Sequence, residues 1–116
     1  MTYHYIKPDN IYKSMMDNTA MVRQFVEMYI AQSPVDFQQL TKSVQAGDYR
    51  EIADAAHQIK PTMEYVGATA LRLDFQELET AARQEEDLTA IREKLEAVHV
   101  KFDDFLHELT VFRDSL

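Results

Sequence analysis

Residues 56–67 read Ala56-His57-Gln58-Ile59-Lys60-Pro61-Thr62-Met63-Glu64-Tyr65-Val66-Gly67, and the organisation of the whole chain follows from this stretch. Counting from Ile52, apolar side chains recur at alternating steps of four and three residues, at positions 52, 56, 59, 63 and 66. This spacing predicts an amphipathic helix with one buried face. At about 100° per residue, His57 lies roughly 140° from the middle of that face, so we expect an exposed imidazole.

Lys60 lies one helical turn after His57, on the adjoining part of the same surface. A neutral imidazole keeps a lone pair on one ring nitrogen near pH 7, so it can act as a nucleophile without a partner base. A lysine ammonium can pair with phosphoryl oxygens as a point charge. The pair is therefore a candidate carrier of a phosphoryl group.

Three short motifs follow one another here: Ala56-His57-x-Ile59-Lys60, Gly67-Ala68-x-x-Leu71 and Leu78-Glu79. Together they resemble the pattern of histidine-containing phosphotransfer (HPt) domains. The resemblance implies that His57 accepts the phosphoryl group and that Lys60 stabilises it. It also implies that Gln76 and Glu79, on the following helix, contact the imidazole or its phosphoryl group. The alternative for these two residues is a solvated helix face with pairs of Glu and Arg.

Two residues depart from the family pattern. Pro61 replaces a usual glycine, and Glu64 replaces a usually small residue. A mid-helix proline removes a backbone hydrogen bond at a typical cost of about 3 kcal/mol, so we expect a kink that tilts His57 outward. Glu64 would repel a phosphoryl group unless Lys60 or a basic residue of the partner pairs with it, and it is a candidate for partner selection. Both residues are predicted to belong to the docking surface.

The composition is that of one helical domain spanning residues 1–116. Hydrophobic residues make up 46% and charged residues 28% of the chain, as in ordinary globular domains. There is no cysteine, which excludes disulfides and thiolate chemistry. A net charge of −8 argues against nucleic-acid binding and against a basic membrane-surface helix. With no signal peptide and no long apolar run, we expect a cytoplasmic monomer.

The helical pattern extends along the chain. Residues 1–9 show no helical period and are predicted to form an arm. A short helix containing Ile11, Tyr12, Met15 and Met16 follows and ends near Asp17-Asn18. Further helices are predicted over 19–32, 33–46, 48–66, 69–83 and 88–112, with Asn18 or Thr19 as one cap, a capping pair Asp48 and Glu51, and Gly67 as a C-terminal cap.

The pattern leaves open whether Pro34 kinks one long helix or separates two. Short connections place consecutive helices beside one another. The predicted fold is therefore all-α: an up-down-up-down antiparallel four-helix bundle of long helices with a short extra N-terminal helix. The resemblance places that short helix beside the active histidine, where Ile11, Tyr12 and Met15 would form an apolar rim for a partner. Alternatively, they cover one end of the bundle.

The chain shows no Gly-rich phosphate loop and no acidic cluster patterned for Mg²⁺. The resemblance implies that a response-regulator receiver domain supplies the aspartate and the Mg²⁺, with a hybrid histidine kinase as a further partner. The chain itself would need no cofactor and no metal, and would be an intermediary rather than an enzyme.

Two other functions compete with this one. A carboxylate-bridged metal bundle is suggested by Asp54-x-x-His57 and Asp104-x-x-His107, but both histidines lie off the apolar faces and no Glu-x-x-His occurs. The better rival is an HPt-like interaction module that binds a receiver or kinase without phosphotransfer, and Pro61 and Glu64 motivate it. His4, in the arm, and His99 and His107, on the last helix, are predicted to be surface residues.

Overall fold

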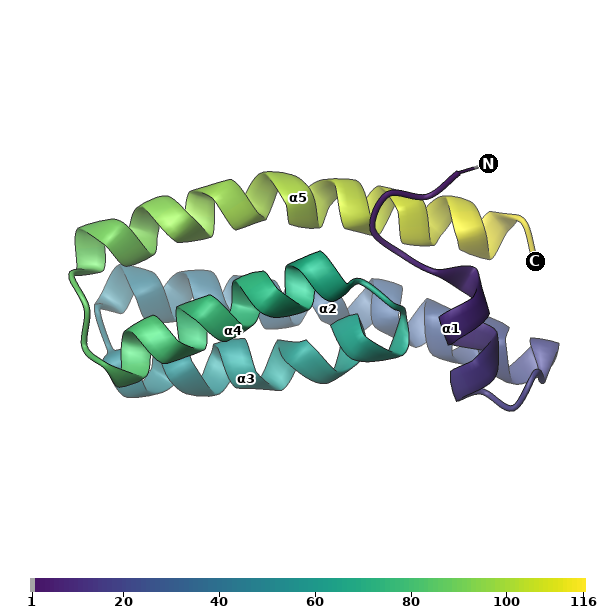
Figure 1. Ribbon diagram of the computed structural model, residues 1–116, viewed down its shortest axis with the longest axis horizontal. Coiled ribbons are helices and arrows are strands. Elements are labelled where there is room, and N and C mark those ends of the chain that lie inside the picture. The colour runs from purple at the N-terminus through teal and green to yellow at the C-terminus, as the bar shows by residue number, and fades with distance from the viewer. Residues whose placement is uncertain (1) are drawn as a thin grey trace.

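The computed structural model describes residues 2–116, which fold into five helices and no strand: α1 (Pro8–Ser14), α2 (Thr19–Ala46), α3 (Tyr49–Tyr65), α4 (Thr69–Arg83) and α5 (Leu88–Asp114). Figure 1 shows α2 to α5 as an up-down-up-down antiparallel bundle, with α1 lying across one end. The predicted all-α bundle with a short extra helix is confirmed. The arm is shorter than predicted, because α1 begins at Pro8, and Met15 and Met16 lie beyond its last residue.

The predicted caps account for where the helices begin and end. The Asn18 side chain, rather than Thr19, caps α2 by accepting the N–H of Met21 at 3.1 Å. Asp48 caps α3 in the same way, accepting the N–H of Glu51 at 3.1 Å. Gly67 follows α3 with a φ of 74°, the left-handed conformation that glycine adopts without strain.

Both helices that contain an internal proline are continuous. Helix α2 runs through Pro34 as a single element, which decides between the two predicted arrangements, and α3 runs through Pro61. In the first half of α2, the buried side chains are Val22, Val26 and Tyr29. Met21 and Met28, by contrast, are 38% and 48% exposed.

The predicted apolar faces of the last three helices form the core. Phe102 of α5 stacks on Phe37 of α2 with ring centroids 4.5 Å apart, and Phe75 of α4 meets both rings edge-on. The buried side chains of α3, α4 and α5 include Ile52, Ala56, Ile59, Met63, Leu71, Phe75, Leu78, Ala82, Ile91, Leu95, Val98, Phe102, Phe105, Leu109 and Phe112. Their burial fixes which faces of α3 and α4 remain outside.

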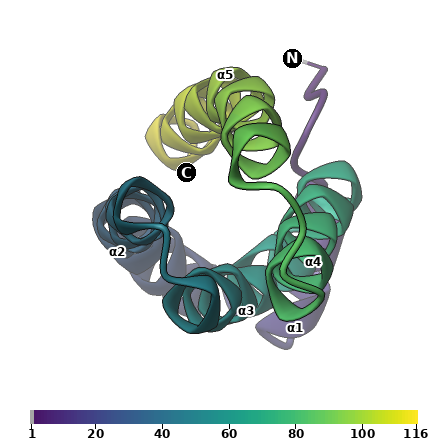
Figure 2. The same cartoon turned by 90° about the vertical axis from the view of Figure 1, so that its left-hand side faces the viewer.

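The four bundle helices are unequal in length, as the predicted ranges also indicate. Helices α2 and α5 have 28 and 27 residues, whereas α3 and α4 have 17 and 15. At about 1.5 Å per residue, the long pair extends well beyond the short pair. Figures 1 and 2 show that the N-terminal segment and α1 lie at this overhanging end. Ile6 and Ile11 of this region are buried, so they complete the core there.

A buried carboxylate fastens the N-terminal segment to α5. Glu108 is only 6% exposed, and its two oxygens accept the backbone N–H groups of His4 and Tyr5 at 2.9 Å and of Ile6 at 3.3 Å. These three donors lie outside any helix or strand, so Glu108 supplies the partner that buried N–H groups require. Ile6 is thereby held in the core, where it is 2% exposed.

The same segment is also attached to the α3–α4 connection. The N–H of Lys7 donates to the carbonyl oxygen of Val66 at 2.9 Å. The contact is so close that a Cβ atom on Gly67 would lie 2.7 Å from the Cβ of Lys7. The segment therefore bridges α5 and the end of α3.

A Glu108→Ala variant is expected to lose about 3 kcal/mol of unfolding free energy, because it leaves three backbone N–H groups without their charged acceptor. Urea unfolding measures this loss, and amide hydrogen exchange at residues 4–6 locates it. Glu93→Ala, on the exposed side of α5, is the control for the charge change. Equal stability of the two variants would refute a clamping role for Glu108.

Candidate functional site

Polar pairs join the outer edges of α3 and α4, among them His57 with Glu79, Lys60 with Gln76, and Glu64 with Arg72. Because the two helices are antiparallel, residues later in α3 lie opposite residues earlier in α4. The short connection over residues 66–68 fixes this register. Side chains from two separate segments are thereby brought onto one surface.

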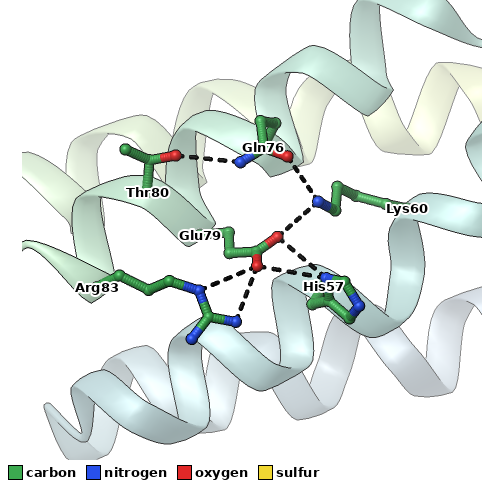
Figure 3. Close-up of polar contacts among 6 residues, drawn as sticks. All are labelled: His57, Lys60, Gln76, Glu79, Thr80 and Arg83. Carbon is green, nitrogen blue, oxygen red and sulfur yellow. Dashed lines mark hydrogen bonds and ion pairs between the residues drawn. The ribbon is translucent and has the colours of Figure 1, made fainter.

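His57 lies on that surface as predicted, with 66% of its side chain exposed. Its Nδ1 atom lies 3.3 Å and 3.4 Å from the two carboxylate oxygens of Glu79, as Figure 3 shows. Because a carboxylate accepts hydrogen bonds, this geometry assigns the ring proton to Nδ1. The lone pair is then on Nε2, in a ring that is open to solvent.

Glu79 is the centre of the polar cluster, and its side chain is only 8% exposed. Lys60 Nζ lies 2.6 Å from one oxygen, and Nε and Nη2 of Arg83 lie 3.1 and 2.9 Å from the other. The solvated-face alternative is therefore wrong for Glu79. Arg83 was not among the predicted site residues, although its spacing of four residues from Glu79 is the spacing of a helical ion pair.

Two opposing effects set the pKa of Glu79. Burial alone would raise this pKa, but the hydrogen bonds from Lys60 and Arg83, with a smaller one from His57, outweigh burial and lower it. The carboxylate is thus ionised at neutral pH and can hold a cationic imidazole ring.

Acid is expected to remove the stability that these bonds provide. Because the folded pKa lies below the usual value of about 4.3, this stability is fully present above that pH and is lost as the pH falls through the folded pKa. Urea unfolding of the wild type and Glu79→Gln at pH 7 and pH 3 checks this expectation. The difference in unfolding free energy between the wild type and Glu79→Gln should be smaller at pH 3 than at pH 7. An equal difference at the two pH values would contradict the expected loss of stability in acid.

Lys60 is directed toward α4. Its side chain is 17% exposed, and Nζ donates to the Oε1 atom of Gln76 at 2.6 Å in addition to its pairing with Glu79. Gln76 in turn donates to Thr80 Oγ1 at 3.1 Å. Gln76 therefore contacts Lys60 rather than the imidazole, and its contact with a phosphoryl group stays a prediction.

A depression of about 200 Å³ lies beside the histidine, lined by His57, Lys60, Pro61, Glu64 and Arg72. Glu64 is paired within the chain, because its Oε2 lies 2.8 Å from Nε of Arg72. The predicted partners of Glu64 were Lys60 or a basic residue of another protein. Sequence spacing gave no signal for Arg72, because the pair depends on the register between two helices.

The N-terminal helix corrects the predicted apolar rim. Ile11 is 0% and Met15 6% exposed, so neither side chain is accessible to a partner in this structure. Tyr12 is partly exposed and packs edge-on against Phe112, with ring centroids 6.3 Å apart. Helix α1 adjoins the C-terminal end of α3, where Ser14 Oγ donates to the carbonyl oxygen of Tyr65 at 3.4 Å. Tyr65 lies more than two helical turns after His57.

The described residues give the metal-bundle alternative no ligand set. Within residues 2–116, no group of three or more His, Cys, Asp or Glu side chains is arranged to hold a metal ion. His99 and His107 are exposed, as predicted. In the same range, no helix has the length and apolar character needed to cross a membrane.

The Hpt domain family model matches residues 24–111, a range that includes His57, Lys60 and Glu79. The chain therefore belongs to the Hpt domain family, whose function is histidine phosphotransfer in phosphorelays. Its fold is similar to the crystal structure of histidine-containing phosphotransfer protein B (HptB) from Pseudomonas aeruginosa PAO1. The two share 18% sequence identity and a TM-score of 0.88, over 99% of each chain. No curated protein matches the sequence.

Proposed function

We propose that this chain carries a phosphoryl group on Nε2 of His57 between receiver-domain aspartates in a multistep two-component phosphorelay. One observation carries the proposal: the exposed imidazole has its Nδ1 atom 3.3 Å from the buried carboxylate of Glu79. This contact leaves Nε2 as the nucleophile and keeps the ring in one orientation.

The transfer is a single displacement at phosphorus. The Nε2 lone pair attacks the phosphorus of an aspartyl phosphate on the receiver, and the N–P bond forms as the P–O bond breaks. The electron pair of that bond returns to the aspartate carboxylate. The product ring retains its Nδ1 proton and is cationic, so the nearby Glu79 carboxylate stabilises it. The reverse displacement passes the phosphoryl group to a second receiver.

Lys60 and Gln76 support this chemistry. Lys60 places a positive charge one turn from His57, which favours the phosphoryl group, and it also fixes one oxygen of Glu79 at 2.6 Å. Gln76 holds the ammonium from the other side. The proposed roles are therefore phosphoryl stabilisation for Lys60 and positioning for Gln76 and Glu79.

The remaining parts of the reaction would come from the partner. A receiver domain would supply the aspartate and a bound Mg²⁺, which neutralises charge on the transferring group. The chain would dock through the exposed surface around His57, which includes Pro61 and Glu64. A hybrid histidine kinase that contains a receiver domain would fit the same surface.

The test uses receiver domains from the source organism, each phosphorylated with a small acyl phosphate or by its own kinase. Each is mixed with the chain, and intact mass follows transfer of an acid-labile, base-stable phosphoryl group. Rapid labelling of the wild type by one or two receivers supports the proposal. The matched control is His57→Gln.

The interaction module remains the second candidate. It is favoured by the inward direction of the Lys60 ammonium and by the Glu64 carboxylate, which is 66% exposed beside the histidine. A receiver that binds the chain without ever labelling it would establish this function instead. Substitution of Pro61 and Glu64 by small residues would then show whether these residues block transfer.

A further inference from the structure

The structure brings a third cation, Arg72, to the surface around His57. Arg72 lies on α4 and lines the depression beside His57, together with Glu64 and Pro61 of α3. Its Nε atom lies 2.8 Å from Oε2 of Glu64. The depression is open to solvent and, at about 200 Å³, has room for a phosphoryl group, since one water occupies about 30 Å³ in the liquid.

The two other cations near the ring, Lys60 and Arg83, already form ion pairs with Glu79. Lys60 is 2.6 Å from one carboxylate oxygen, and Arg83 directs both Nε and Nη2 to the other. A carboxylate that is 8% exposed depends on such partners, because removing them leaves a buried charge without compensation. Neither cation can turn fully toward a phosphoryl group without uncovering Glu79.

Arg72, by contrast, does not pair with a buried carboxylate. Its side chain is 35% exposed and that of Glu64 is 66% exposed, and ion pairs this open contribute little to stability. A guanidinium has five N–H donors, whereas the bond through Nε uses one. A phosphoryl group offers three acceptor oxygens and nearly two negative charges near pH 7, against the single charge of Glu64.

We propose that Arg72 binds the phosphoryl oxygens of phosphorylated His57, and that Glu64 holds Arg72 in place until the group arrives. This inference rests on the proposed function. Glu64 lies seven residues after His57, about 10 Å along the helix, so Arg72 turns back over Pro61 to reach the phosphoryl group. No covalent bond changes in this step: the guanidinium exchanges one carboxylate for phosphoryl oxygens.

The test measures the charge around the phosphoryl group without any receiver. The chain is phosphorylated with potassium phosphoramidate, and the phosphorus resonance that is absent from His57→Gln is titrated by NMR. Arg72→Gln is expected to raise the titration midpoint by about one pH unit, because a nearby cation favours the dianion. Arg72→Lys should restore part of the shift. The matched control is Arg50→Gln, an exposed residue of α3 seven positions before His57.

Glu64→Gln completes the experiment. It should lower the midpoint in the wild type by releasing Arg72, and this effect should shrink when Arg72 is already glutamine. A midpoint that Arg72→Gln and Arg50→Gln change equally would overturn the role of Arg72 while leaving phosphorylation of His57 intact. If no resonance depends on His57, the proposed function and the inference both fail.

Discussion

A His57→Gln variant is expected to accept no phosphoryl group from any receiver that labels the wild type. Glutamine has no nitrogen with an available lone pair, because its amide nitrogen is conjugated with the carbonyl. The side chain at this position is 66% exposed, so the substitution should change the unfolding free energy by no more than about 0.5 kcal/mol. Intact mass after incubation with the phosphorylated receiver measures the loss.

His107→Gln is the matched control, since it also replaces an exposed histidine on a helix. This variant should be labelled at the wild-type rate. Receiver binding by His57→Gln, measured by calorimetry, should stay close to that of the wild type. Acid-labile label on His57→Gln would assign the phosphoryl group to another residue and would refute the proposed site.

The second large effect is expected at Glu79. A Glu79→Ala variant should accept the phosphoryl group about 100-fold more slowly, because the imidazole loses the group that orients it and misplacement of a reacting atom has effects of this size. Lys60 and Arg83 lose their shared partner as well. Glu79→Gln retains an oxygen that can accept a hydrogen bond from the Nδ1–H group, so its rate should fall between those of the wild type and the alanine variant.

Rapid-mixing measurements of label transfer, with receiver affinity measured separately, distinguish orientation of the ring from docking. Glu77→Ala is the matched control, because Glu77 lies on the same helix and pairs with Lys94 instead, at 2.7 Å. Its transfer rate should be that of the wild type. If Glu79→Ala also transferred at the wild-type rate, the proposed positioning role would be wrong.

Local periodicity predicted the bundle because each long helix carries its own apolar face. The spacing of Ile52, Ile59 and Met63 placed His57 outside, and the structure agrees. The position of α1 was left open between two alternatives. It depends on which segments meet across the bundle, and a pattern within one segment holds no information on this point.

The polar cluster shows the same limit. Glu79 lies off the apolar face of α4, and periodicity therefore treated it as a candidate for solvent. It is buried because two cations and an imidazole surround it, two of these groups coming from another helix. The pairing of Glu64 with Arg72 likewise requires the register between α3 and α4, which a single sequence does not show.

The attachment of the N-terminal segment to α5 has a consequence for the order of folding. His4 and Glu108 are 104 positions apart, whereas His57 and Glu79 are 22 apart and Lys60 and Gln76 are 16 apart. Contacts between near neighbours in sequence close smaller loops and form sooner. We expect the α3–α4 hairpin to assemble early and the N-terminal segment to dock last. On the ribosome, the residues of the histidine site would also emerge before Glu108, which locks the first segment.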